Sequence, residues 1–399
     1  PERLSNELCS LRPNEDKLCM SVIVEMDPNA KVIRHKICRT VICSDYRLTY
    51  RHAQDILDNQ VQDSQLKNPQ LTIAINTLDQ LAKQLRANRF RLGAINFETP
   101  EVHFRLDENG EPVSIFFHKL FDSNHLIEEF MLLANRIVAA EIGRKKKNAD
   151  NQEKEAKPFV YRVHDNPDPE KIGKLSTFIK RFGLHLKVSS NSKTTHKHLN
   201  NLLDDCQGRP CQTLVETLTI RSMAKAVYST DNIGHYGLAF PYYTHFTSPI
   251  RRYPDMMVHR LISKYLLQSK ALCRHDKEEL EQACIHCSER ELAAQMAERD
   301  SIKEMHARWI SNHLGEEFDA IISGVTEFGL FVQLTDTLTE GLVPIRTIEK
   351  NDYMQFDEEN FCLIAARSGK TYTLSDSVRV RVTKVDVERK LIDFVLVEE

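Results

Sequence analysis

Two adjacent arginines, Arg251 and Arg252, stand in the segment of this sequence that is best suited to chemistry. Pro249 precedes them and Pro254 follows, and a helix is expected to begin at one of these prolines, because proline is tolerated mainly in the first turn. Either start leaves both arginines near a helix N-terminus, where backbone N–H groups and guanidinium groups can bind a phosphate together. The alternative is structural: Arg251 pairs with Asp255 at the start of a charged helix.

Two other features have weaker chemical content. Cys284 and Cys287 are separated by two residues, as zinc ligands often are, but they lie in a helical pattern without a second pair nearby. We therefore expect no zinc site. The sequence also lacks a glycine-rich phosphate loop, which argues against a nucleotide-driven motor.

The spacing of apolar residues divides the chain into a part with helices and strands and a β-rich end. The expected strands of the first part are 19–26, 31–43, 94–97, 102–105 and 112–117, and its expected helices are 51–68, 73–92, 126–142, 169–183, 211–228 and 276–312. Five short strands follow, at 318–322, 329–334, 341–343, 378–382 and 391–396. They predict a small OB-fold barrel, so the fold class is α+β.

Length, composition and charge limit the class of protein. The chain has 399 residues, of which 41% are hydrophobic and 28% charged; this allows two or three domains and excludes a mostly disordered chain. No apolar run is long enough to span a membrane, and ten cysteines are too few for a secreted disulfide scaffold, so we expect a cytoplasmic protein. The net charge of −3 divides into +5 for residues 1–312 and −8 for residues 313–399, which favours separate domains.

Several motifs together resemble one family. Residues 244–255 read Thr-His-Phe-Thr-Ser-Pro-Ile-Arg-Arg-Tyr-Pro-Asp, and residues 1–11 read Pro-Glu-Arg-Leu-Ser-Asn-Glu-Leu-Cys-Ser-Leu. Both resemble the ribonuclease II / ribonuclease R family of processive 3′-to-5′ exoribonucleases, most of all its bacterial ribonuclease R branch. Residues 324–332 resemble that family's RNA-binding barrel, of the type first named in a ribosomal protein. The resemblance implies a mixed α/β catalytic domain at 1–312, incomplete at its N-terminus, and an OB-fold barrel at 313–399.

The resemblance also implies roles for individual residues. Arg251 matches the arginine that contacts the scissile phosphate, where its charge would stabilise the phosphorane-like transition state. Phe97 matches an aromatic that stacks near the 3′-terminal base, and Tyr50 matches an aromatic that grips RNA. Glu128 matches an acid that positions the terminal nucleotide, and Glu298 matches another acid that faces RNA.

Glu128 and Glu129 are notable even without the resemblance. They interrupt a helix that is otherwise apolar, where an unpaired carboxylate is costly. The structural alternative to an RNA contact is that they pair with Arg136 or with another buried arginine. The residue types alone leave both possibilities open.

In the barrel, Phe328 and Phe331 are the candidates for stacking on RNA. Pro344 stands where many relatives have histidine, and the barrel is acidic overall. Phosphate affinity comes largely from lysine and arginine, so this acidic barrel alone is not expected to bind RNA tightly. We expect it to guide RNA instead. The main channel then lies in the basic portion, which includes Arg252 and the run 144–147; that run can equally be a solvated helix end.

The implied function is hydrolysis of RNA to nucleoside monophosphates, with Mg²⁺ as cofactor and single-stranded RNA or RNA with a 3′ overhang as substrate. The family holds Mg²⁺ with closely spaced aspartates upstream of the motif at residues 1–11, and no such run occurs before residue 13. Other acids, namely Asp165, Asp168, Asp204 and Asp205, are interpreted as helix-cap or surface residues. We therefore expect a monomeric fragment that hydrolyses RNA negligibly alone, without a small-molecule cofactor or membrane contact. The alternative is a non-catalytic RNA-binding or scaffold protein with a decayed nuclease core.

Overall fold

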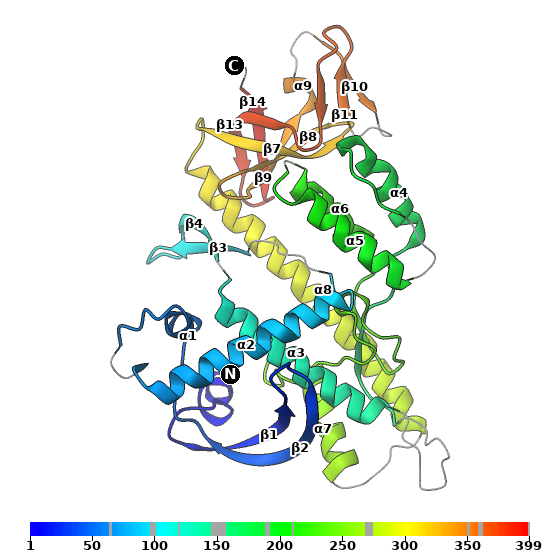
Figure 1. Cartoon of the computed structure of the whole chain (residues 1–399). Helices are drawn as coiled ribbons and strands as arrows, with labels where there is room; N and C mark the ends of the chain where they lie inside the picture. Colours follow the sequence, from blue (N-terminus) through cyan, green and yellow to red (C-terminus); the bar gives the residue numbers. More distant parts are fainter. Residues whose placement is uncertain are drawn as a thin grey trace. The chain divides into compact units, whose positions relative to one another are not determined.

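The computed structural model describes residues 1–63, 66–95, 101–118, 120–144, 157–187, 192–209, 211–267, 274–348, 352–357 and 362–397 (Figure 1). The chain forms two compact units. The first unit comprises Pro1–Asn96, Leu120–Pro167 and Ala224–Glu291, and the second comprises Phe97–Lys119, Asp168–Met223 and Leu292–Glu399. In the described part of the chain, no helix combines the length and the apolar character needed to cross a bilayer.

A long antiparallel hairpin opens the first unit. β1 (Asp16–Met26) pairs with β2 (Val32–Cys43), as the alternation of apolar residues predicted. The turn between them is fixed by Asp27, whose Oδ1 accepts hydrogen bonds from the backbone N–H groups of Asn29 and Lys31, each at 2.9 Å. An aspartate that caps its own turn in this way sets the register of the two strands.

Helix α3 forms the centre of the first unit because it is apolar on nearly every side. The helices of this unit are α1 (Tyr50–Leu57), α2 (Pro69–Arg91), α3 (Asp122–Gly143), α7 (Tyr253–Ile262) and the first part of α8 (Arg274–Ser311). Leu133 and Ile137 of α3 pack with Leu85 of α2. Other α3 residues pack with α7 and with the ribbon of β5 (Tyr161–Val163) and β6 (Val227–Ser229).

The second unit contains a hairpin, three helices, the end of α8 and a closed barrel. The hairpin is β3 (Glu101–Leu106) with β4 (Pro112–His118), and the helices are α4 (Pro169–Ile179), α5 (Ser192–Cys206) and α6 (Gln212–Ser222). The barrel strands, yellow to red in Figure 1, are β7 (Glu317–Thr326), β8 (Gly329–Leu334), β9 (Glu340–Pro344), β13 (Ser377–Asp386) and β14 (Leu391–Leu396). Between β9 and β13 lie α9 (Ile345–Ile348) and a sheet of β10 (Met354–Asp357), β11 (Cys362–Ala365) and β12 (Thr371–Thr373).

The barrel closes in the order β13-β14-β9-β8-β7, which confirms the five predicted strands. Its interior is filled by alternate residues of each strand, including Leu330, Val332 and Phe394, all with no exposed surface. Gly329 starts β8 with a φ of +149°, and a Cβ there would overlap the carbonyl oxygen of Val343. Only glycine fits at this position, so the turn after Phe328 depends on it.

Some of the predicted elements differ from the structure. The helix expected over 51–68 ends at Leu57, and the helix expected over 211–228 ends at Ser222. Residues 227–229 instead form β6, because they find a partner strand more than sixty residues earlier in the chain, a contact that local periodicity cannot reveal. Helix α5 and the β10–β12 sheet were not predicted. The strand expected at 94–97 lies partly outside the described residues, and its described part, 94–95, is not strand.

Candidate nucleic-acid interface

Helix α7 begins at the second of the two prolines. Arg252 precedes the helix and Pro254 lies in its first turn, where proline costs no hydrogen bond. Asp255, in the same turn, is fully buried. Its Oδ1 accepts hydrogen bonds from Arg252 Nη2 at 2.9 Å and from the backbone N–H of Ser248 at 2.7 Å. The loop is therefore folded back onto the start of the helix by one carboxylate.

Arg251 is outside this pairing. The predicted structural alternative, an ion pair between Arg251 and Asp255, is wrong, because Arg252 is the partner of that carboxylate. Arg251 is exposed beside the start of α7, where its guanidinium can reach a phosphate. The side chain of Arg252 is 20% exposed and its Nε is buried without a hydrogen-bond partner among the described residues. A direct RNA contact by Arg252 stays a prediction.

The residues before these arginines are anchored in the core. Asn135 of α3 accepts a hydrogen bond from the backbone N–H of Phe246 at 3.0 Å and donates one to Tyr243 Oη at 3.3 Å. Thr244 Oγ1 donates to the carbonyl of Val160 at 2.7 Å. Because these contacts are buried, the segment that carries Arg251 starts from a fixed position.

His245 is a structural imidazole in this segment. Burial lowers its pKa to about 2, and the positive charge of Arg252 adds to the effect. The imidazole is therefore neutral at physiological pH, and a hydrogen bond of 2.8 Å joins its Nδ1 to Tyr228 Oη. Burial also raises the pKa of Tyr228, which keeps its hydroxyl proton in place. Neither group is suited to exchange protons with a substrate at neutral pH.

Tyr50 lies at the first position of α1 and is 48% exposed. Thr49 caps the helix, since its side chain accepts a hydrogen bond from the backbone N–H of His52 at 3.1 Å. The carbonyl of Tyr50 accepts a hydrogen bond from Ser123 Oγ of α3 at 2.8 Å. The tyrosine ring is thus available to a ligand while its backbone is tied to α3.

Glu128 and Glu129 are held by a buried arginine, as the structural alternative anticipated. That arginine is Arg89 of α2, and Arg136 instead lies over the ring of Phe240. Arg89 Nη2 is 2.5 Å from Glu129 Oε1 and 3.3 Å from Glu128 Oε1. The Glu129 side chain is 3% exposed and the Glu128 side chain is 45% exposed. Glu128 is therefore the carboxylate with the larger exposed surface, whereas Glu129 lines a pocket between α2 and α3.

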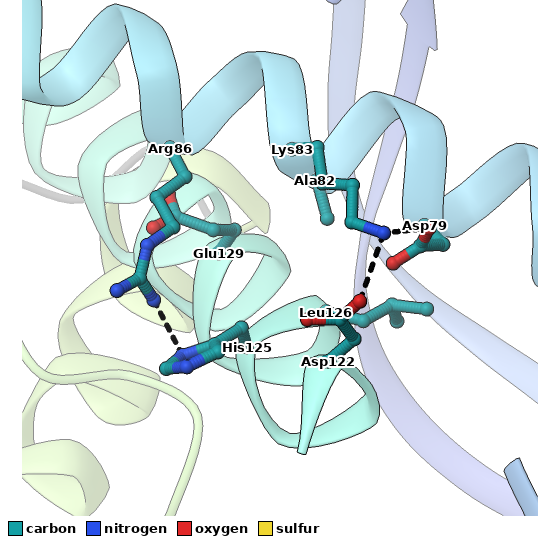
Figure 2. A pocket seen from close by; sticks show the side chains of 8 residues that line it. All are labelled: Asp79, Ala82, Lys83, Arg86, Asp122, His125, Leu126 and Glu129. Carbon is teal, nitrogen blue, oxygen red and sulfur yellow. Dashed lines mark hydrogen bonds and ion pairs between the residues drawn. The ribbon is translucent and has the colours of Figure 1, made fainter. Parts of the chain in front are cut away.

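A pocket of about 250 Å³ lies between α2 and α3 beside these acids (Figure 2). Asp79, Lys83 and Arg86 line it from α2, and Asp122 and His125 line it from α3. Lys83 Nζ bridges the two aspartates, at 2.8 Å from Asp79 and 2.9 Å from Asp122. The two helices thus contact each other through charged side chains as well as through apolar ones.

The remaining candidates belong to the second unit. Phe328 and Phe331 are 52% and 36% exposed, and their rings meet edge to face with centroids 6.0 Å apart. Glu298 is exposed on α8. The barrel therefore offers two neighbouring aromatic surfaces of the kind on which bases can stack. Phe97 lies outside the described residues.

In the ranges that the structure describes, no three His, Cys, Asp or Glu side chains converge as a metal would require. Asp168 caps α4 by accepting a hydrogen bond from the backbone N–H of Glu170, and Asp165, Asp204 and Asp205 are exposed, as interpreted from the sequence. Burial raises the pKa of the Cys284 thiol to about 12, which disfavours the thiolate that zinc needs.

Sequence reasoning missed Arg89, Asn135 and the pairing of Arg252 with Asp255. One signal was present for Arg89, because it continues the stripe of Ala82 and Leu85 on the buried side of α2. An arginine at a core position needs a buried partner, and the acids of α3 were the available ones. Asn135 and the arginine pairing had no comparable signal.

Comparison with known proteins assigns the chain to a family. Residues 1–268 match the family model of the RNB domain. The chain belongs to the RNB-domain family. Residues 313–396 match the S1 RNA binding domain, so the predicted fold class and the resemblance to the ribonuclease II / ribonuclease R family are both confirmed. The division at 312/313 stays a prediction.

Full-length relatives support the same family. Ribonuclease R of Aquifex aeolicus is 40% identical over 100% of this chain and 55% of that protein. Ribonuclease R of Thermotoga maritima is 39% identical, with the same coverage of both chains. The apo form of Mycoplasma genitalium RNase R superposes with a TM-score of 0.88 at 24% identity, covering 100% of this chain and 60% of that one. This RNB-domain chain therefore spans about half the length of its curated relatives.

Proposed function

We propose that this chain grips the 3′ end of RNA for a processive 3′-to-5′ exoribonuclease that releases nucleoside monophosphates. The observation that carries the proposal is the exposed Arg251, presented beside a helix start by the buried pair of Arg252 and Asp255, in a chain of the RNB-domain family. Its guanidinium is free of that pair and its backbone is fixed. This is the arrangement needed to stabilise charge on a phosphate.

Each of the other exposed candidates offers a chemical group that suits single-stranded RNA. Tyr50, Phe328 and Phe331 offer aromatic faces, which bind any base and so suit a general degrader. Glu128 offers a carboxylate, which can accept hydrogen bonds from ribose hydroxyls. A structure of Mycoplasma genitalium RNase R was solved with ribose methylated single-stranded RNA. By analogy we propose single-stranded RNA, or RNA with a 3′ overhang, as the ligand of this chain.

The test is equilibrium binding of a fluorescein-labelled oligoadenylate to the 399-residue chain at several salt concentrations. Replacing Arg251 by methionine should weaken binding and reduce the slope of log K against log salt by about 0.7, the value for one lost phosphate contact on a single strand. Arg260→Met, at an exposed arginine near the end of the same helix, is the matched control. Equal affinity and slope for Arg251→Met and the wild type would contradict the assignment.

Hydrolysis is tested separately. We propose that Mg²⁺ is the cofactor of hydrolysis by a longer protein that contains this chain and is as long as its ribonuclease R relatives, and that the 399-residue chain alone hydrolyses RNA negligibly. Robust magnesium-dependent digestion of labelled oligoadenylate by this chain would overturn the second statement. In the longer protein, Arg251→Ala should lower turnover while RNA binding largely persists, and normal turnover would refute its catalytic role. If the longer protein binds RNA but does not hydrolyse it, the chain belongs to a non-catalytic RNA-binding protein instead.

A monomeric state, a cytoplasmic location and the absence of a small-molecule cofactor complete the proposal. RNA contacts by Phe97, Arg252 and Glu298 also belong to it. Each of these three RNA contacts can be examined with the same oligoadenylate assay, by replacing one side chain at a time. A contact by Phe97 or Glu298 is supported where the affinity falls while the melting temperature is unchanged, and a contact by Arg252 where the slope of log K against log salt falls.

A further inference from the structure

One guanidinium, that of Arg89, forms hydrogen bonds to two carboxylates between α2 and α3. Arg89 Nε and Nη2 lie 3.1 and 2.5 Å from the same oxygen of Glu129, and Nη2 also lies 3.3 Å from Glu128 Oε1. Arg89 is 6% exposed. Its guanidinium carbon lies 4.8 Å from the centre of the Phe90 ring, which packs beneath it. The guanidinium is therefore held by packing as well as by charge.

The two carboxylates have different surroundings. Glu129 is almost completely buried, where an unpaired carboxylate is costly, and Arg89 supplies the compensating positive charge. Glu128 is nearly half exposed and does not need a partner for that reason. The shared Nη2 nevertheless holds one of its oxygens at 3.3 Å, while His125 Nδ1, which lies 3.2 Å from the other oxygen, also contacts Arg86 Nη1. Because a guanidinium can only donate, that ring nitrogen accepts from Arg86, and Arg89 is the donor that fixes the exposed carboxylate from the side of the protein.

We propose that Arg89 is a positioning residue, which orients the Glu128 carboxylate toward the hydroxyl groups of the 3′-terminal ribose, and that Glu129 is the buried counter-ion of Arg89. A carboxylate accepts hydrogen bonds only, and the hydroxyls of a terminal ribose are the donors that distinguish it from a deoxygenated end. The inference rests on the proposed function, in which Glu128 contacts RNA.

A neighbouring ion pair provides a matched control. Lys83 also links α2 to α3, and its ion-pair partners in the described part of the chain are Asp79 and Asp122, not Glu128. Figure 2 shows Lys83 with its two aspartates, and Glu129 on the same helix as Asp122. If Arg89 merely fastened the helices together, removal of Lys83 should have a similar effect on RNA recognition.

The experiment compares binding of two oligoadenylates, one with an ordinary 3′-terminal adenosine and one with a 2′,3′-dideoxy end, to the 399-residue chain. The wild type should prefer the hydroxyl-bearing end by about fivefold, as expected for one hydrogen bond. Glu128→Ala should abolish the preference. The double variant Arg89→Met/Glu129→Leu removes both buried charges together, so it should fold while Glu128 loses its support, and the preference should again be lost.

A second variant separates the loss of Glu128 positioning from misfolding of the protein. Arg89→Lys keeps the buried positive charge but lacks the fork that reaches two carboxylates, so it should reduce the preference at a near-normal melting temperature. Lys83→Met should retain the full preference. Wild-type preference in both the double variant and Arg89→Lys would overturn this inference alone. A wild type that does not bind RNA, or that has no preference for a hydroxyl-bearing end, would overturn the proposed contact of Glu128 and this inference with it.

Discussion

Arg251 and Arg252 are neighbours of identical chemistry that the structure places in opposite roles, and this predicts opposite mutant phenotypes. Replacing Arg252 by methionine keeps most of the side-chain volume but leaves Asp255, which has no exposed surface, without its cation. Replacing Arg251 removes an exposed charge that is outside this pair. The first change should therefore act on folding and the second on RNA binding.

The size of the first effect follows from the geometry. At 2.9 Å the pair has a Coulomb energy of about 6 kcal/mol for an effective dielectric constant near 20, largely offset by the cost of burying both charges. Removing one partner of a buried pair costs about 3–5 kcal/mol. Because Arg252 is 20% exposed, we expect about 3 kcal/mol for Arg252→Met.

Urea denaturation of the two variants measures this contrast. Arg252→Met should lose about 3 kcal/mol of unfolding free energy, and Arg251→Met less than about 0.5 kcal/mol. The double variant Arg252→Met/Asp255→Leu should recover much of the loss, because it leaves no buried charge unpaired. Equal stability of the two single variants, or additive losses in the double variant, would refute the reasoning.

Three further predictions concern acid stability, the barrel turn and base stacking. The folded-state pKa of His245 is depressed from 6.5 to about 2, so its stabilising effect is complete above pH 6.5 and is lost as the pH falls toward 2; the unfolding free energy should decline by up to about 1.4 kcal/mol per pH unit below pH 5.5, and His245→Gln should remove this part of the slope in urea titrations. Gly329→Ala should cost more than about 2 kcal/mol because its Cβ meets backbone, whereas Gly369→Ala, with φ of +71° and open space around it, should cost about 1 kcal/mol; equal losses would contradict the steric argument. Phe328→Ala should change the melting temperature little but weaken oligoadenylate binding by about 1–3 kcal/mol, and unchanged affinity would exclude stacking there.

The sequence predicted most elements whose signal is local. The apolar periodicity of 126–142 and 276–312 placed α3 and α8, and the five strands after residue 317 predicted the closed barrel. The length of the helix expected over 51–68 was overestimated, because α1 ends at Leu57. β6 was interpreted as helix because its partner strand, β5, is remote in the chain.

For the candidate site, the sequence by itself determined the residue types: two arginines near a helix start, two acids on an apolar helix and aromatic residues suited to bases. The tertiary structure decided which member of each pair faces outward. The buried Asp255 selected Arg252 and left Arg251 exposed, and the buried Arg89 took Glu129 as its counter-ion and left Glu128 at the surface. Adjacent residues of one type are equivalent in a sequence, and they become different only when a buried charge must find one specific partner across the core.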